Sequence, residues 1–326
     1  MNDSLRYILR RVAEFVVSMA ALAFVIFSLL YIAPGDPARS LVGTKHVTPE
    51  LLAQIRAKYG LDDPFFVQFG NWISGALHGD FGESIRAGQP VLDYIAPHAA
   101  VTFQLVLLSL VLSVVFGVFF GIVSAKGRGK LRDSAINTVA LVGTSAPSFA
   151  VGLFFLYVFA LKCGWFPIYG IGDGGALDQL WHLALPAIAL TFAVSALLVK
   201  ITRSAMLLET EKDYSVFLRA RAIAPLRITM AQLKNASAPV LTSTGLVLAN
   251  LFGGTVLVES VFSIPGLGNL LASSVTFHDV PVVQFIALML AFIVCFASAV
   301  VDIAVYLIDP TSRQRRRLYR EVEATG

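Results

Sequence analysis

Residues 209–239 read ETEKDYSVFLRARAIAPLRITMAQLKNASAP, a polar and basic stretch between two long apolar runs. Asp213 and Tyr214 stand where a helix is expected to begin, and the alanine and arginine residues that follow favour helix. Pro225 is a residue type that opens helices, so a second short helix is expected to start there. Two spans need no linker this long and this ordered, and we interpret the stretch as a docking element for a partner protein.

The composition is that of a membrane protein. Hydrophobic residues make up 56% of the chain and charged residues only 14%, whereas soluble domains carry about 25% charged residues. Several uninterrupted apolar runs of about 20 residues can cross a bilayer as helices, and they lack the alternation of barrel strands. Cys163 and Cys295 match no metal-ligand spacing and are expected to pack as small apolar side chains.

Six transmembrane helices are predicted, so the fold class is all-α. They lie at roughly 9–33, 98–125, 135–161, 183–204, 239–262 and 283–308. The chain is then divided into a first segment with its span (1–33), an outer loop with short helices (34–97), a five-helix core (98–308) that contains the basic loop 205–238, and a basic tail (309–326).

The distribution of lysine and arginine sets the orientation. Most of the 25 basic residues lie in the N-terminal segment, in 126–134, in 200–238 and in the tail, whereas the short loops 163–182 and 263–282 contain none. Because cytoplasmic loops are enriched in these residues, both termini and the 209–239 stretch are predicted to be cytoplasmic. The net charge of +4 thus reflects topology, and we expect no nucleic-acid partner.

The large outer loop is expected to be helical. Thr48 can cap a helix that runs to Tyr59 and stops at Gly60, and aromatic residues at amphipathic spacing predict a second helix near 65–77. Two interpretations stay open: a lid packed on the outer face of the bundle, or a landing surface for a partner that delivers substrate.

The chain contains none of the short motifs that mark nucleotide binding or common hydrolytic chemistry, and we expect it not to be an enzyme. Charged residues within the predicted spans are few. Lys200 and Arg203 can reach the headgroups, and Asp302 is expected to bond one helix to another. Glu259 either pins the loop that follows it or lines a pathway. An ion-coupled carrier would place carboxylates near the bilayer midplane, and their scarcity disfavours that class.

Residues 264–269 predict a tight turn on the outer side. Pro265 fixes φ and lacks an amide donor, while Gly266 and Gly268 permit positive φ and close backbone approach. Glu259, one to two turns earlier, is placed to cap this turn. The turn is predicted either to gate the pathway or only to close the loop between the fifth and sixth spans.

The sequences ESVFSIPGLGNL at 259–270 and HDVPVVQ at 278–284 resemble the end of the fifth span and the outer loop of ABC-importer permeases of the dipeptide/oligopeptide/nickel family. The resemblance covers nearly the whole chain. Further matches, in order, are PGDP at 34–37, GLD at 60–62, GDFG at 79–82, SAPSF at 145–149, LPA at 185–187, TRSAM at 202–206, Asp302 with Tyr306, and DP at 309–310. Each match is weak alone, but their order along one chain is specific.

The resemblance implies that the basic loop contacts an ATPase subunit. The residues that match the family's contact sequence are Asp213, Tyr214, Arg219, Ala220, Arg221, Asn235 and Pro239, with Pro225 opening the second helix. The chain departs from the family at Ala222, where a glycine is usual, and near Ala231 or Gln232, where a histidine is usual. Because alanine disfavours positive φ, the first departure bears on the geometry of the turn.

The fold implied is that of a type I ABC importer permease in a bacterial or archaeal cytoplasmic membrane. The implied partners are a second permease, commonly a paralogue, two cytoplasmic ATPase subunits that bind ATP and Mg, and an extracytoplasmic substrate-binding protein. No cofactor is expected in this chain itself. The implied substrates are di- or oligopeptides, or related peptide-like or nickel-complex compounds. The alternatives are an ion-coupled secondary carrier or channel without an ATPase and, more weakly, a membrane enzyme.

Overall fold

The structure is a computed structural model that describes residues 3–32, 38–39, 48–59 and 61–308. The predicted motif at 34–37, the predicted helix stop at Gly60 and the basic tail 309–326 lie outside these residues. The helices are α1 (Asp3–Ile32), α3 (Pro49–Tyr59), α4 (Phe65–Leu77), α5 (Val91–Lys126), α6 (Leu131–Ser145), α7 (Ser148–Phe155) with the π-helix η1 (Leu156–Lys162), α8 (Ala176–Glu211), α9 (Asp213–Ala220), α10 (Pro225–Asn235), α11 (Ser237–Val261), α12 (Leu267–Thr276) and α13 (Val280–Ile308).

The predicted all-α membrane fold is confirmed. Within the described residues, α1, α5, α8, α11 and α13 are long and apolar enough to cross a bilayer, and α6 with α7 and η1 makes a sixth span if the bent pair is counted as one. The helices α5 and α8 exceed their predicted spans at both ends, and Pro97 and Pro186 lie inside them. The predicted loop 163–182 therefore ends inside α8, and the predicted loop 205–238 begins inside it.

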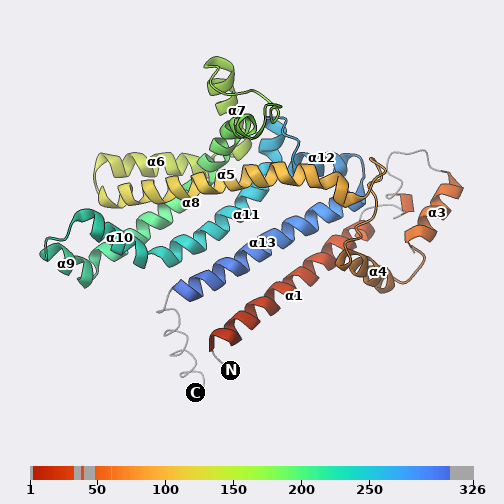
Figure 1. Ribbon diagram of the computed structural model, residues 1–326, viewed down its shortest axis with the longest axis horizontal. Coiled ribbons are helices and arrows are strands. Elements are labelled where there is room, and N and C mark those ends of the chain that lie inside the picture. The colour runs from red at the N-terminus through yellow and green to blue at the C-terminus, as the bar shows by residue number, and fades with distance from the viewer. Residues whose placement is uncertain (1–2, 33–37, 40–47, 60, 309–326) are drawn as a thin grey trace.

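The third predicted span, 135–161, is not one straight helix. Its two halves, Leu131–Ser145 and Ser148–Lys162, are bent by 109°. Pro147 has no amide hydrogen and disfavours helical dihedrals at the residue before it, and Ala146 is accordingly extended, at φ −85° and ψ 128°. The protruding α7 is visible in Figure 1, pointing away from the helices that run along the bundle.

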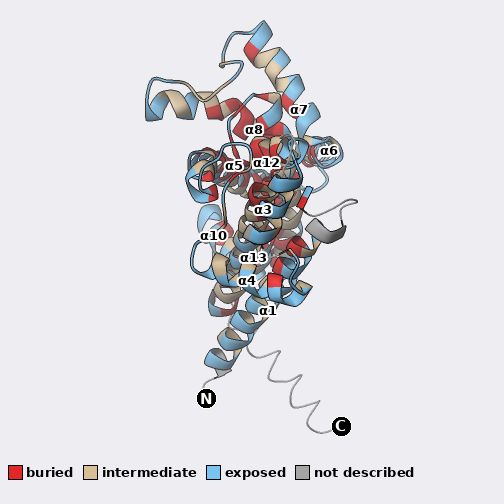
Figure 2. Ribbon diagram, turned by 90° about the vertical axis from the view of Figure 1, so that its right-hand side faces the viewer, coloured by how far each residue is buried: buried red, intermediate tan, exposed pale blue. Residues whose placement is uncertain are grey.

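The core is built around α8, which packs against α5, α6 and α11. Glycines on α5 permit the closest of these contacts, since a Cβ on Gly117 would collide with Leu198 and one on Gly121 with Thr202. Figure 2 shows the buried residues gathered along α5, α8 and α12, with exposed residues outward. The outward apolar residues are those of a protein whose surroundings are lipid and other subunits.

The segments rich in lysine and arginine share one end of the molecule. Figure 1 shows α9 and α10 at the same end as the start of α1, the turn between α5 and α6 and the end of α13, with α3, α4 and α12 at the opposite end. The predicted topology requires this arrangement, and the basic end is the cytoplasmic one.

The first and last spans are joined near the cytoplasmic end. An Arg11 guanidinium nitrogen lies 3.3 Å from Asp302 Oδ2, and the rings of Tyr7 and Tyr306 stack at 4.2 Å. The expected contact of Asp302 with another helix is present, as an ion pair.

The outer loop forms the two expected helices. The Thr48 hydroxyl accepts the Leu51 amide at 3.2 Å and so caps α3. The helix α4 packs on the outer end of α1 through aromatic rings, namely those of Phe24 and Phe27 against Phe65, Phe69 and Trp72. This packing agrees with the lid interpretation for α4.

Candidate functional site

The basic loop folds into the two predicted helices, and the turn between them has a defined geometry. Ala222 lies at φ +52°. The Ile223 amide donates to the Leu218 carbonyl at 3.2 Å and the Ala222 amide donates to the Arg219 carbonyl at 3.0 Å. This pair of bonds is the Schellman motif, in which glycine is preferred at the left-handed position. The turn therefore forms with alanine in the place usual for glycine, and the first helix ends at Ala220.

The carboxylate of Glu209 holds the end of α8 to the start of α9. Its Oε2 accepts the Tyr214 hydroxyl at 2.7 Å and its Oε1 lies 2.6 Å from Lys212 Nζ. The Ser215 hydroxyl donates to the Glu209 carbonyl at 2.6 Å. Burial, and then the bond to Glu209, raises the pKa of Tyr214, so its phenol stays neutral and donates. The junction is thus held by hydrogen bonds and an ion pair around the buried Glu209 and Ser215, which favours a stiff connection.

The helix α10 is fastened to the same junction. The Gln232 amide donates to Ser215 Oγ at 3.1 Å and lies 3.4 Å from Thr210 Oγ1. The Arg219 guanidinium donates to the carbonyls of Thr210 and Ser215. Gln232 is one of the two positions, with Ala231, near which the family's histidine was expected, and its amide links α10 to α8 and α9.

An apolar face on α9 and α10 points outward. Val216 (56% exposed) and Phe217 (54%) lie on α9, and Leu226 (64%) and Met230 (58%) lie four residues apart on α10. Ala220 is one helical turn beyond Val216 and Phe217, on the same face. Sequence reasoning missed this face, although apolar pairs at helical spacing in a basic loop could have shown it.

The remaining predicted loop residues lie at the margins of this unit. Asp213 is the first residue of α9, and the Arg221 guanidinium lies 4.4 Å over the Phe217 ring. Pro225 opens α10, as predicted, and Asn235 is its last residue. Pro239 lies in the first turn of α11.

At the outer side, Glu259 caps the helix that follows its own. Its side chain is completely buried, Oε1 accepts the Thr102 hydroxyl at 2.5 Å, and Oε2 accepts the Asn269 amide at 3.0 Å. Thr102 in turn accepts the Leu267 amide at 2.7 Å. Two amides of the first turn of α12 are satisfied in this way, and a carboxylate at a helix N-terminus is electrostatically favoured. These bonds are the contacts that the pinning interpretation of Glu259 requires.

The predicted turn at 264–269 differs from the structure in two respects. Its second half is the first turn of α12, and the positive φ lies at Ser263 (+51°), whereas Gly266 has φ −104°. Glycine is required by space instead, since a Cβ on Gly266 would collide with the Glu259 carboxylate and one on Gly268 with the Val256 backbone. Pro265 stands directly before these two contacts.

A second buried carboxylate, Asp279, holds the outer loop. The Ser84 hydroxyl donates to its Oδ2 at 2.5 Å, the Ile85 amide donates to Oδ1 at 3.1 Å, and the Arg86 amide donates to Oδ2 at 3.2 Å. Arg86 also lies 4.1 Å over the ring of Phe277. Two motifs of the sequence resemblance, around 79–84 and 278–284, thus meet in space.

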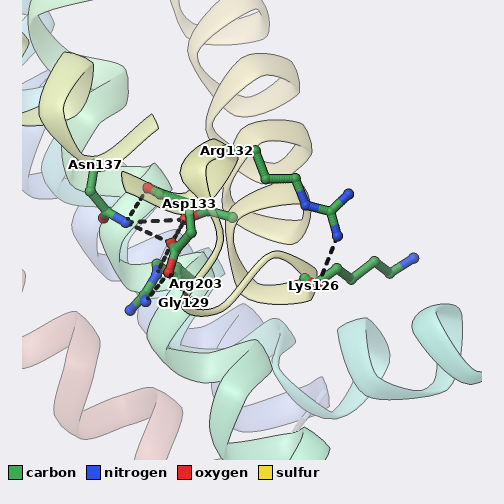
Figure 3. Close-up of polar contacts among 7 residues, drawn as sticks. Lys126, Gly129, Arg132, Asp133, Asn137 and Arg203 are labelled. Atoms are coloured by element: carbon green, nitrogen blue, oxygen red, sulfur yellow. Dashed lines mark hydrogen bonds and ion pairs between the residues drawn. The ribbon is translucent and has the colours of Figure 1, made fainter. Parts of the chain in front are cut away.

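At the cytoplasmic end, Arg203, which was expected to reach the lipid headgroups, is ion-paired with Asp133. Its Nε and Nη2 each lie 2.8 Å from an oxygen of Asp133, in a two-pronged contact (Figure 3). The sequence offered no sign of this pair, because 70 residues separate the two side chains. Farther along the same helices, a mostly apolar cavity of about 500 Å³ lies among α5, α6, α7 and α8.

Comparison with known proteins identifies the family. Residues 117–314 match the family described as binding-protein-dependent transport system inner membrane component, and residues 4–107 match its N-terminal family. The chain is 36% identical to the probable peptide ABC transporter permease protein y4tP of Sinorhizobium fredii, over 94% of this chain and 99% of that protein. It is 34% identical to the glutathione transport system permease protein GsiC of Escherichia coli K12, over 95% of this chain and all of that protein.

A solved structure supports the fold. The chain superposes on a chain of the inward-facing MetNI methionine ABC transporter with a TM-score of 0.55 and 16% identity, covering 66% of this chain and 96% of that one. The fold is therefore shared with an ABC importer despite the low identity. Taken with the two family matches, this places the chain, as a multi-pass protein of the cytoplasmic membrane, in the family of binding-protein-dependent transport system inner membrane components.

Proposed function

We propose that this chain is one permease subunit of an ATP-driven importer and that α9 and α10 are the contact through which a cytoplasmic ATPase moves it. The observation that carries the proposal is the outward apolar face of Val216, Phe217, Leu226 and Met230. This face lies at the cytoplasmic end, beyond the spans. Large apolar side chains exposed outside the membrane support a protein–protein contact.

The mechanism follows from how the two helices are attached. A push on α9 is transmitted to α8 through Glu209 and Tyr214, and a push on α10 reaches the same point through Gln232 and Ser215. Because α8 is one continuous helix from Ala176 to Glu211 and packs at the centre of the core, a rigid junction at its end moves the core. ATP and Mg would be bound by the partner ATPase subunits.

The substrates proposed are di- or oligopeptides or related peptide-like compounds. The relatives named for peptide and glutathione transport support this class over nickel complexes. A second permease, a paralogue of this chain, would complete the pathway, and the family description supports a substrate-binding protein on the outer side.

An ion-coupled carrier remains the second candidate but gains no support from the structure's buried carboxylates. Glu259 is bonded to Thr102 and Asn269, and Asp133 is paired with Arg203, so each is committed to holding helices together. A transported ion would need ligands that are free to bind it.

The docking proposal is tested by introducing a charge into the apolar face. Ala220→Glu is expected to abolish co-purification of the ATPase subunits with the membrane-inserted permease. Leu131→Glu is the control, because Leu131 is 90% exposed at the start of α6 and lies at the same end of the molecule. Full ATPase retention and normal ATP-driven transport by Ala220→Glu would contradict the proposal.

A further inference from the structure

The carboxylate of Asp133 lies where three helices meet at the cytoplasmic end (Figure 3). Besides the two bonds from Arg203 of α8, Asp133 Oδ1 accepts the Ser124 hydroxyl of α5 at 2.6 Å, and Oδ2 accepts the Gly129 amide at 3.2 Å. The Asn137 side-chain amide, one turn later on α6, donates to Oδ1 at 2.7 Å. A two-pronged arginine–carboxylate contact fixes orientation as well as distance, so the carboxylate sets the position of α6 relative to α5 and α8.

A side chain at the start of α6 is also bonded to the backbone at the end of α5. The Arg132 guanidinium donates to the carbonyl of Lys126, the last residue of α5, at 2.9 Å. On α8, Arg203 lies six residues before Glu209, about 9 Å along the helix axis at about 1.5 Å per residue. The ion pair therefore joins α8 to α6 at a point about 9 Å along α8 from Glu209, at the junction with α9.

Farther from the cytoplasm, α6 meets α8 through small and apolar residues. Ala140 packs with Ala196 and Val199, and a Cβ on Gly143 would lie 2.7 Å from the Phe192 carbonyl oxygen. Small residues of this kind allow the two helix backbones to approach closely. The two-pronged contact of Asp133 with Arg203 adds a fixed orientation to this packing.

The helix α6 forms one wall of the 500 Å³ cavity. Ala135, Ile136, Val139 and Ala140 of α6 face residues of α5 and α8 across it, among them Phe116, Phe120 and Phe192. The helix then leads into α7 through the 109° bend. Any displacement of α6 against α8 would change the shape of this cavity and the direction of α7.

We infer that Asp133 and Arg203 are a positioning pair that makes α6 move as one body with α8, so that a displacement of α9 and α10 is carried into the wall of the cavity. The inference rests on the proposed function, because the displacement is supplied by the ATPase. Without the pair, α8 would move under the ATPase and α6 would lag behind it.

The test measures movement of α6 relative to α8 within the assembled complex. ATP hydrolysis is assayed on the same preparation. Spin labels are placed on exposed positions of α6 (Leu141) and α8 (Leu208) after Cys163 and Cys295 have been replaced. Pulsed electron paramagnetic resonance then measures the distance between the two labels in the nucleotide-free and vanadate-trapped states. In the wild type the distance distribution between the labels is expected to be the same in both states. In Asp133→Asn and Arg203→Gln it is expected to broaden or shift on trapping.

Two further variants separate positioning from folding. Arg128→Gln is the matched control, since Arg128 pairs with Glu211 of the same helix α8 at 2.7 Å but at an exposed site, where an ion pair contributes little. It is expected to behave as the wild type. The double variant Asp133→Asn/Arg203→Gln is expected to be no worse than the more affected single variant, as for two residues that act as a unit.

Arg203→Lys, which keeps the charge but loses the two-pronged contact, is expected to be intermediate. It decides the matter if the other variants fail to assemble. Labels that stay as invariant in the assembled variants as in the wild type would overturn the inference, and so would labels that already separate in the wild type. A wild-type complex without ATP hydrolysis would show that the proposed function itself had failed, and the inference with it.

Discussion

The Tyr214 hydroxyl donates to Oε2 of Glu209 at 2.7 Å, across the single residue at which α8 ends and α9 begins. A polar group bonded to a buried charge is held more firmly than one bonded to water, because breaking the bond leaves the charge unsolvated. The two residues therefore make the change of direction between α8 and α9 a rigid corner. The coupling role proposed for α9 and α10 depends on this rigidity.

Replacing Glu209 by glutamine should loosen the corner. Hydrogen bonds to charged groups contribute roughly 1.5–3 kcal/mol each, and glutamine keeps the shape but loses the charge that Lys212 and Tyr214 share. We expect faster hydrogen exchange of the α9 amides and less ATP-driven transport for each ATP hydrolysed. Glu211→Gln, at an exposed neighbouring position, is the control. Equal exchange rates in the two variants would show that Glu209 does not stiffen the junction.

Replacing Ala222 by glycine should stabilise the turn between α9 and α10. Alanine at positive φ costs about 1 kcal/mol or more, and glycine removes that cost at the expense of some entropy in the unfolded chain. A net gain of roughly 0.5–1 kcal/mol is expected, seen as slower exchange of the Ala222-position and Ile223 amides. Ala224→Gly, just beyond the turn, should give no such gain. If hydrogen exchange is not slowed in either variant, the left-handed turn at Ala222 is not strained.

Glu259→Gln tests whether the cap of α12 also gates the pathway. Because the carboxylate is completely buried and accepts bonds from Thr102 and Asn269, its loss should destabilise the outer turn by on the order of 1–3 kcal/mol. Glutamine has nearly the same shape as glutamate, so shape alone would predict a smaller loss of stability. If the turn gates, the assembled complex in proteoliposomes should also show an altered basal ATPase rate and altered uptake of a labelled dipeptide. Wild-type values for both would leave Glu259 with its capping role only.

Asp279→Ala should release the outer segment that the carboxylate holds. The variant loses the bonds from Ser84, Ile85 and Arg86, so local opening should rise by about tenfold or more for a loss of about 1.4 kcal/mol or more. Trypsin added outside should then cut after Arg86 correspondingly faster. Asp93→Ala, at an exposed position of α5, is the control. Unchanged cleavage would show that the segment is held by other contacts.

The sequence predicted the helices of this fold because their signals are local. Apolar length located the spans, Pro225 marked the start of α10, and Thr48 the cap of α3. The bend between α6 and α7 could have been expected from Pro147, but a long apolar run on both sides favoured one span. The length of α8 was underestimated because its last turns are polar.

The contacts that hold the candidate site together could not be predicted from the sequence. Asp133 and Arg203 are 70 residues apart, Ser84 and Asp279 are 195 apart, and no local pattern announces either pair. The capping position of Glu259 could be predicted because Asn269, whose amide it accepts, lies only 10 residues later in the chain. Glu209, in contrast, was quoted within the basic stretch but had no assigned role, since its importance comes from burial, which the sequence does not state.

The contact of α9 with an ATPase is the central claim, and site-specific photo-crosslinking tests it most directly. A benzoylphenylalanine residue is introduced at Phe217 or Leu226 of the outward apolar face, or at Leu131 of α6 as the exposed control at the same end. The account predicts ATPase adducts from positions 217 and 226, stronger in the vanadate-trapped complex, and none from position 131. An assembled, active complex that gives no adduct at 217 and 226, or equal adducts at all three positions, would contradict it.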